Sequence, residues 1–358
     1  MEKNFTKDGL ILLNKSRGIS SFGAISHLKR VIKAKKVGHA GTLDPMAEGL
    51  MIVMINDATK FSGDLMKKDK EYYVEMELGY KTDTYDLEGT IIEKYESEIN
   101  ISDSKIIKTI NSFKRKMKQV PPMYSAIKVK GQKLCDLARK GIEVERAERN
   151  VNISEIREIK IIRPDKNSEN SQNIKISFYT KVSSGTYIRS LVYDIGEELG
   201  VFATMTRLVR TKIGRLDIED AITLEKAETE IGKLKKLVEA KRENESFWAT
   251  KSDAAIRAEK IREIVCFVEI EYILDYYGIN VSNEKYGRLK NGMTVIDTFK
   301  KFENISKKIN KRENIRENQK FKIYVRNRDT NKREFRGIVK IASIRGDRIY
   351  LKRDKYFL

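Results

Sequence analysis

The segment GHAGTLDPMAEG, residues 38–49, brings three glycines together with an Asp-Pro pair. This composition predicts a tight loop, because glycine tolerates positive φ and proline cannot continue a helix or a central strand. A loop of this kind can hold Asp44 rigidly and let a ligand approach the backbone closely at Gly41. The alternative from these residues alone is that Asp44 only shapes an Asp-Pro turn and that His39 is a surface residue.

The sequence around this loop alternates between strand-like and helical patterns. Residues 10–13 form an apolar strand pattern, and residues 72–78 and 174–182 alternate apolar and polar side chains as half-buried strands do. From Ile188 the apolar period becomes helical, and Gly200 can end that helix. An earlier helix, capped by Ser20 or Ser21, should bury Phe22, Ile25, Leu28 and Ile32. These patterns predict a mixed α/β fold without the regular βαβ repeats of a doubly wound sheet.

The chain of 358 residues is long enough for two domains and is strongly basic, with 72 Lys and Arg against 52 Asp and Glu. Its formal charge of +20 indicates a polyanionic partner, although a merely soluble basic protein could have the same charge. Residues 281–358 hold 23 basic and 9 acidic residues, which is +14 of the +20. This asymmetry predicts a separate β-rich domain. We expect domains at 1–268 and 269–358, a charged helical connection over 225–265, and a solvated basic excursion at 301–320.

Several classes of chemistry lack their sequence signatures. The two cysteines, Cys135 and Cys266, form no CxxC pair, and the two histidines, His27 and His39, are too few for a histidine-rich metal site. The sequence has no GxxxxGK[ST] loop, GxGxxG turn or HExxH helix, which argues against ATP chemistry, hydride transfer and zinc hydrolysis. Neither a secretion signal nor a long apolar run is evident, so we expect a cytoplasmic protein that does not span a membrane. Carboxylate, tyrosine and arginine chemistry remain for a catalyst.

The 38–49 segment resembles the catalytic loop of the TruB-type tRNA pseudouridine synthases, whose aspartate lies in a GHxGTLDPxAxG stretch. Further segments resemble that family in the same order along about 215 residues. They are GLILLNKSRGISS at 9–21, KEYYVEMELGYKTDTYDLEG at 70–89, VPPMYSAIKVKGQKLCDLARKG at 120–141, VSSGTYIRSLVYDIGEELG at 182–200 and MTRLVRTKIGRLDIEDAITL at 205–224. The resemblance implies an α+β fold, the pseudouridine synthase fold, with a mixed, largely antiparallel sheet flanked by helices. More loosely, residues 334–358 resemble the PUA-like domain, a small β-rich RNA-binding domain.

The resemblance also implies an activity: an isomerase that converts the T-loop uridine of tRNA, position 55, to pseudouridine without a metal or an organic cofactor. An ionised carboxylate suits this chemistry, because it can capture or stabilise an electron-deficient sugar carbon while the detached base rotates and reattaches through C5. The implied partner is the T stem-loop of tRNA. We expect a monomer without an obligatory protein partner.

Two residues carry the implied chemistry. Asp44 matches the family's catalytic aspartate, which attacks C1′ or adds to the base. Arg189, in GTYIRS, matches the arginine that keeps this carboxylate ionised, and its alternative role is a surface ion pair at the start of a helix.

Four further residues match substrate-contacting positions of the family. Tyr72 matches the tyrosine that packs on the target base, Tyr187 resembles a second such tyrosine, and Leu208 resembles an apolar pocket residue. His39 matches the residue that fills the space of the everted base, since a base in a folded RNA loop must leave its stack to be reached. The alternatives are a buried strand tyrosine for Tyr72, core packing for Leu208 and a loop-shaping role for His39.

Two other functions fit parts of the sequence. An RNA-folding chaperone with idle catalysis would have the same charge, but it would not need Asp44, Tyr72 and Arg189 together. A guide-RNA-directed relative acting on ribosomal RNA would share the catalytic motifs, although the Lys-rich tails of such proteins are not evident. The sequence departs from the family pattern at Glu48, where a small hydroxyl residue is usual, and this places a negative charge near the RNA path.

Overall fold

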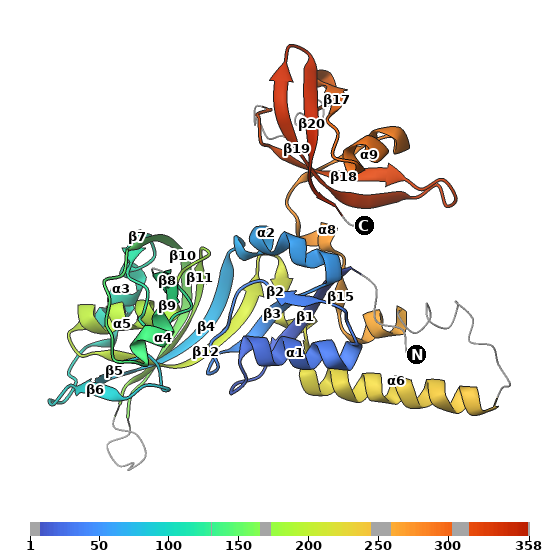
Figure 1. Cartoon of the computed structure of the whole chain (residues 1–358). Helices are drawn as coiled ribbons and strands as arrows, with labels where there is room; N and C mark the ends of the chain where they lie inside the picture. The colour runs from blue at the N-terminus through green and yellow to red at the C-terminus, as the bar shows by residue number, and fades with distance from the viewer. Residues whose placement is uncertain (1–7, 130, 165–172, 245–258, 303–314, 357–358) are drawn as a thin grey trace.

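A computed structural model describes residues 8–129, 131–164, 173–244, 259–302 and 315–356. Most of these residues belong to two sheets, which Figure 1 shows as a long sheet with helices packed on it and a smaller sheet set apart from it. No helix in the described part of the chain is long and apolar enough to cross a membrane.

The larger sheet has 11 described strands, and its main path runs β14-β1-β3-β12-β4-β11-β10-β7. Along this path only β1 with β14 and β3 with β12 are parallel, so the predicted mixed, largely antiparallel sheet is confirmed. The strands of the path are β14 (Ile222–Thr223), β1 (Gly9–Lys15), β3 (Glu48–Ile55), β12 (Ala203–Ile213), β4 (Lys70–Leu78), β11 (Lys175–Val182), β10 (Arg149–Ile162) and β7 (Lys116–Gln119). The strands beside it are β2 (Val37–His39), β13 (Leu216–Asp217) and β15 (Phe267–Val268).

Half of this sheet is covered on both faces. On one face, Ile11 and Leu13 of β1 pack with helices α1 (Ser21–Ile32) and α6 (Leu224–Asn244). On the other, Leu10 and Leu12 pack with the 3-10 helix η1 (Asn56–Phe61) and with α2 (Ser62–Met66) and α8 (Ile270–Ile273). This double burial explains the continuous apolar run of β1, and each such side chain contributes roughly 1.5–3 kcal/mol of burial energy.

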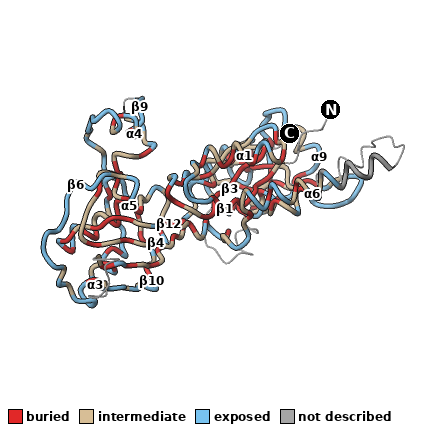
Figure 2. The backbone as a smooth tube through the Cα atoms, turned by 90° about the horizontal axis from the view of Figure 1, so that it is seen from below, coloured by how far each residue is buried: buried red, intermediate tan, exposed pale blue. Residues whose placement is uncertain are grey.

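The other half of the sheet packs against α3 (Asp103–Ser112) and α5 (Ile188–Leu199). Strands β4 and β12 are long and cross between the two halves, and Figure 2 shows buried positions along both of them as well as along β1 and β3. Short elements border this half: the pair β5 (Tyr80–Thr82) and β6 (Ile91–Lys94), the pair β8 (Lys128–Val129) and β9 (Gln132–Lys133), and α4 (Leu134–Ala138).

The two helices predicted after Ser20 and from Ile188 both form, with one difference in packing, and α6 forms the described start of the predicted helical connection. Ser20 caps α1 by accepting from the Gly23 amide at 3.0 Å, and Gly200 ends α5 with φ +75°. The expectation that Phe22 faces inward is wrong, because its side chain is 74% exposed. The buried face of α1 is centred near Ser21 and Ile32, and at about 100° per residue Phe22 lies roughly 90° from it.

The smaller sheet has the order β16-β18-β19-β20-β17 and confirms a β-rich C-terminal region. Its elements are β16 (Tyr277–Asn280), α9 (Asn283–Lys290), β17 (Val295–Thr298), β18 (Lys320–Arg326), β19 (Arg333–Arg345) and β20 (Arg348–Tyr356). The boundary at 268/269 stays a prediction. Most of the basic segment 301–320 lies outside the described residues, as do residues 245–258 of the helical connection.

Candidate active site

The residues between β2 and β3 form the bent loop that the glycines predicted. Gly41 and Gly49 have φ values of +100° and +104°, a region that residues with a Cβ rarely adopt. The amide of Ala47 donates to the carbonyl of Asp44 at 3.1 Å, which closes a turn around Pro45. We call residues 40–49 the aspartate loop.

Three groups outside the aspartate loop fix its central residues. Ser21 Oγ donates to the Leu43 carbonyl and accepts from the Leu43 amide, both at 2.8 Å. Lys15, fully buried in β1, donates through Nζ to the Pro45 carbonyl at 3.4 Å, and the Gly18 amide donates to the same carbonyl at 2.8 Å. The backbone is therefore held on both sides of the loop's carboxylate.

Arg189 reaches this carboxylate from the other half of the sheet. Its Nη2 lies 2.9 Å from Asp44 Oδ2, and its side chain is only 5% exposed, whereas that of Asp44 is 38% exposed. Nη2 also donates to the Tyr124 carbonyl at 2.7 Å, and Nη1 donates to the Thr84 carbonyl at 3.1 Å. These bonds satisfy the buried guanidinium, so its position does not depend on Asp44 alone.

A second carboxylate, Asp86, binds the same guanidinium. Its Oδ2 lies 3.3 Å from Arg189 Nη1, and its side chain is 1% exposed. Its Oδ1 accepts from Thr84 Oγ1 at 2.6 Å and from the Glu88 amide at 3.0 Å. Asp86 is therefore a fixed, buried anchor, while Asp44 occupies the side of the guanidinium that is open to solvent.

Burial raises the pKa of Asp44 above its usual value, Arg189 opposes this rise, and Asp86 adds to it. Arg189 therefore favours the ionised form, as expected, but burial has the larger effect on the pKa of Asp44. The carboxylate sits in a recess of the surface, where many protein atoms surround it while 38% of its side chain still touches solvent. Dehydration is thus partial, and a bound substrate would increase it.

Tyr72 and Leu208 lie in one apolar cluster beside the aspartate loop. Tyr72 on β4 is 8% exposed and Leu208 on β12 is 6% exposed, and both cluster with Leu43 and Met46 of the loop. Leu208 lies opposite Val74, two residues from Tyr72, so the Tyr72 and Leu208 side chains project from the same face of the sheet. The structure brings both predicted pocket residues to the loop's apolar side.

Tyr187 precedes α5 and is held by its backbone. Its amide donates to Gln119 Oε1 at 2.9 Å, and Gln119 Nε2 donates to its carbonyl at 3.0 Å. Burial raises the pKa of the Tyr187 hydroxyl, and the negative charge of Asp44 adds to the rise. The phenol therefore lies within electrostatic range of the carboxylate.

His39 ends β2, paired with Val53 of β3, and leads into the aspartate loop. Burial and the positive charge of Arg210 lower the pKa of the imidazole below its usual value of 6.5, so His39 is neutral at pH 7. Its Nδ1 is buried and has no hydrogen-bond partner among the described residues. A neutral, half-buried ring of this kind can stack against a base without the cost of burying a charge.

Three buried charged residues at this site were not predicted as site residues: Lys15, Asp86 and Arg210. Asp86 lies in the family-like segment 70–89. An acidic residue shortly before a glycine, as in TDTYDLEG at 82–89, is also typical of a surface turn, so nothing distinguished it. Arg210 lies in the segment 205–224, where it follows Leu208 with strand spacing. A signal for Arg210 was available, because it stands two residues after Leu208 and so falls on the same face of a strand as that apolar residue.

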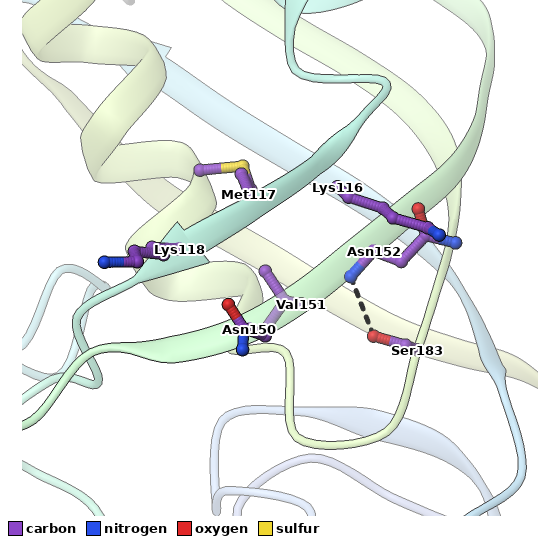
Figure 3. Close-up of a pocket in the computed structure, with 7 residues that line it drawn as sticks. All are labelled: Lys116, Met117, Lys118, Asn150, Val151, Asn152 and Ser183. Carbon is purple, nitrogen blue, oxygen red and sulfur yellow. Dashed lines mark hydrogen bonds between the residues drawn. The ribbon is translucent and has the colours of Figure 1, made fainter.

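The described residues contain no group of three or more His, Cys, Asp and Glu side chains placed to hold a metal ion. A separate cavity of about 380 Å³ lies along β7 and β10, lined by two lysines, two asparagines and Ser183 among others. Figure 3 shows these side chains and the 2.8 Å bond from the Asn152 amide to Ser183 Oγ. This cavity contains none of the predicted site residues.

Comparison with known structures bears on the fold. The crystal structure of a Cbf5-Nop10-Gar1 complex matches with a TM-score of 0.59 at 20% identity, covering 98% of this chain and 85% of that chain. The archaeal box H/ACA sRNP Nop10-Cbf5 complex matches at the same TM-score with 19% identity. This likeness establishes a pseudouridine synthase fold with a C-terminal PUA-like β-domain.

Comparison of sequences goes further. A family model described as the N-terminal domain of TruB family pseudouridylate synthases matches residues 29–188, and a tRNA pseudouridylate synthase B C-terminal domain matches 189–245. The tRNA pseudouridine synthase B of Fusobacterium nucleatum is 48% identical over 212 residues, covering 59% of this chain and 70% of that protein. The Clostridium perfringens protein of the same name (strain 13) is 40% identical over 291 residues, covering 81% and 85%. The chain belongs to the TruB family of pseudouridylate synthases.

Proposed function

We propose that this protein isomerises the uridine at position 55 in the T loop of tRNA to pseudouridine, with Asp44 as the catalytic carboxylate. The relatives named above are tRNA pseudouridine synthases, which supports tRNA as the substrate. The observation that carries the chemical proposal is the 2.9 Å pair between Asp44 and Arg189, at the solvent-open end of an otherwise buried arginine. The protein acts as a single chain in the cytoplasm in this proposal.

The reaction needs a nucleophilic oxygen next to the target nucleotide. Ionised Asp44 adds to C1′ of the sugar or to the base, the bond between N1 and C1′ breaks, and the base rotates. The bond to Asp44 then breaks and its electron pair returns to the carboxylate, a new bond forms between C5 and C1′, the proton on C5 is lost, and N1 takes up a proton. Bonds are exchanged within one nucleotide, so the isomerisation is redox neutral and uses no nucleotide triphosphate.

Arg189 and Asp86 set the charge at the site. The guanidinium stabilises the ionised form of Asp44, while Asp86 fixes the guanidinium from its buried side at 3.3 Å. Arg189 is thus already in place before substrate binds, and no reorganisation is needed when Asp44 regains its negative charge on release.

The apolar cluster supplies the walls for the base. In this proposal Tyr72 stacks on the everted uracil, Leu208 contacts its edge, and Tyr187 contacts the nucleotide from the start of α5. Stacking on an aromatic ring is worth roughly 1–3 kcal/mol per base, which offsets much of the few kcal/mol needed to unstack it. Neutral His39 fills the space that the base leaves in the loop.

The decisive experiment measures tritium release from tRNA that carries 5-tritiated uridine. We expect wild type to release tritium from an unmodified transcript without a guide RNA and to place pseudouridine at the T-loop site of a T-arm minihelix. Asp44→Asn should bind the same RNA and release none. The matched control is Asp103→Asn, which alters an exposed aspartate at the start of α3 that pairs with Arg163.

Each result has a distinct meaning. Full activity of Asp44→Asn would exclude this mechanism, whereas activity only with an added guide RNA would favour the guide-directed alternative. A protein that refolds tRNA but releases no tritium in its wild-type form would be an RNA chaperone. Loss of release in Asp44→Asn with unchanged activity of Asp103→Asn supports the proposal.

A further inference from the structure

Arg210 is a charged side chain in the interior of the protein. It is 1% exposed, and it is the largest fully buried side chain in the described part of the chain. No ion pair of Arg210 occurs among the described residues. Burying a guanidinium without a carboxylate is costly, so its hydrogen bonds must compensate the charge.

These hydrogen bonds all go to main-chain carbonyls at the two ends of the aspartate loop. Arg210 Nε donates to the Leu50 carbonyl at 2.6 Å. Nη2 donates to the Gly41 carbonyl at 3.1 Å, and Nη1 reaches the Thr42 carbonyl at 3.5 Å. The planar guanidinium therefore spans the start of the loop and the strand that follows it, which a single ammonium group could not do.

The backbone around Arg210 ties the same region together. Arg210 pairs with Gly49 of β3 on one side and with Tyr72 of β4 on the other. A register shift in the β12 and β4 pairing follows directly after Arg210, and such bulges redirect side chains near active sites. Gly41 and Gly49 also make room for this residue, since a Cβ at Gly49 would lie 2.4 Å from the Arg210 carbonyl oxygen.

We propose that Arg210 is a positioning residue: by binding the carbonyls of Gly41, Thr42 and Leu50 it holds both ends of the aspartate loop and thereby fixes Asp44 against Arg189. This inference rests on the proposed function of Asp44. Arg210 contacts no reacting atom. Its charge also acts on two neighbours. It lowers the pKa of His39. Burial first, and the charge of Arg210 second, lower the pKa of Lys70 to about 8.

The test uses Arg210→Lys and Arg210→Met in the full chain. Both lose the forked contact, so we expect kcat on a T-arm minihelix to fall, by about 10²-fold for Arg210→Met and less for Arg210→Lys, which keeps the charge and can reach one carbonyl. KM should change by less than about threefold, because the substrate-contacting side chains remain. Arg163→Lys is the control, since this exposed arginine pairs with Asp103 far along the chain from the loop.

Hydrogen exchange gives a readout that does not need activity. Amides of residues 40–50 should exchange faster in Arg210→Lys, while those of the C-terminal sheet stay as in wild type. Imidazole resonances provide another, because the chain has only His27 and His39. Loss of the positive charge in Arg210→Met should raise the pKa of His39, because that charge lowers it in the wild-type protein.

The outcomes separate the two proposals. Inactive wild type would exclude the proposed function, and exchange at residues 40–50 would still decide the role of Arg210. Unchanged kcat in both variants, or exchange that rises throughout the molecule together with lost activity, would overturn the positioning role. If Arg210→Met does not fold, Arg210→Lys decides the question by the same exchange criterion.

Discussion

At the scale of single residues, Asp44 combines two opposed demands. Its carboxylate must be ionised to react, yet burial raises its pKa above the usual value of 3.8 against the pull of Arg189. We therefore expect the acid limb of kcat/KM to lie at higher pH than an ordinary aspartate would give, with activity lost as pH falls through that raised value. A pH profile of tritium release between about pH 4 and 8 measures it, and activity that stays level down to about pH 4 would contradict the assignment.

The same shift has a consequence for stability. A raised pKa means that the folded state prefers protonated Asp44, so the ionised form reduces stability as pH rises above the value of the unfolded chain. Asp44→Asn should then unfold at the same or a higher temperature than wild type at pH 7.

Asp86→Asn should instead lower the free energy of unfolding by roughly 1–3 kcal/mol, because the buried Asp86 carboxylate accepts from Thr84 and Glu88 and pairs with Arg189. Equal effects of the two substitutions would refute this distinction.

Resemblance to a family, and not residue types alone, gave the expected site residues, and it missed others for a physical reason. The pairing of Asp44 with Arg189 followed from a family-like loop and a family-like helix start, and their 2.9 Å contact agrees with it. Asp86 and Arg210 could not be singled out, because a sequence does not reveal which charged side chains are buried. The sign of the Asp44 pKa shift depends on the same unknown, the number of protein atoms around the carboxylate.

At the scale of elements, the backbone at Gly49 offers the sharpest prediction. Gly49 has φ +104°, and a Cβ there would lie 2.4 Å from the carbonyl oxygen and 2.8 Å from the amide nitrogen of Arg210. We expect Gly49→Ala to lower the free energy of unfolding by about 1–3 kcal/mol through the backbone conformation alone. The clash with Arg210 should lower it further, because it forces β3 and β12 apart. Urea unfolding of the purified variant measures this cost.

The matched control is Gly63→Ala in α2. That glycine has no atom within 4 Å of a Cβ, and its φ is not positive, so alanine should be neutral or stabilise by about 0.4–1 kcal/mol. Equal stability of the two alanine variants would show that the Gly49 backbone can relax. Activity offers a second criterion, since Gly49→Ala should also displace the aspartate loop and lower kcat.

Periodicity predicted the regular elements better than their surroundings. The caps at Ser20 and Gly200 and the buried faces of α1 and α5 follow from local spacing, which the chain carries in its own sequence. Phe22 was assigned to the wrong face, because the direction of the buried face depends on the sheet beneath α1. Contacts such as Ser21 with Leu43 join segments far apart in sequence, so local patterns do not contain them.

At the scale of the whole molecule, one buried carboxylate connects the two sheets. Asp64 in α2 is 8% exposed and accepts from Tyr276 Oη at 2.6 Å, and it pairs with Lys355 of β20 and with Lys320 of β18 at 3.5 Å. Apolar contacts accompany these bonds, since Ile338 of β19 belongs to the cluster around β1 and β3. Charge asymmetry predicted a C-terminal module, but nothing in it indicated this junction.

The contacts of Asp64 should fix the distance between the active site and any RNA-binding surface on the C-terminal domain. If the C-terminal domain binds tRNA outside the T loop, Asp64→Asn would loosen its placement, because a neutral amide cannot hold two lysines. We expect KM for full-length tRNA to rise several-fold with kcat unchanged, while both parameters for a T-arm minihelix stay at wild-type values. Asp57→Asn, in the neighbouring η1, serves as the control, since Asp57 pairs with Lys60 at 2.9 Å. A KM increase for the minihelix equal to that for tRNA would mean that Asp64 supports the catalytic domain itself, and the geometry of the two domains would then have no part in substrate affinity.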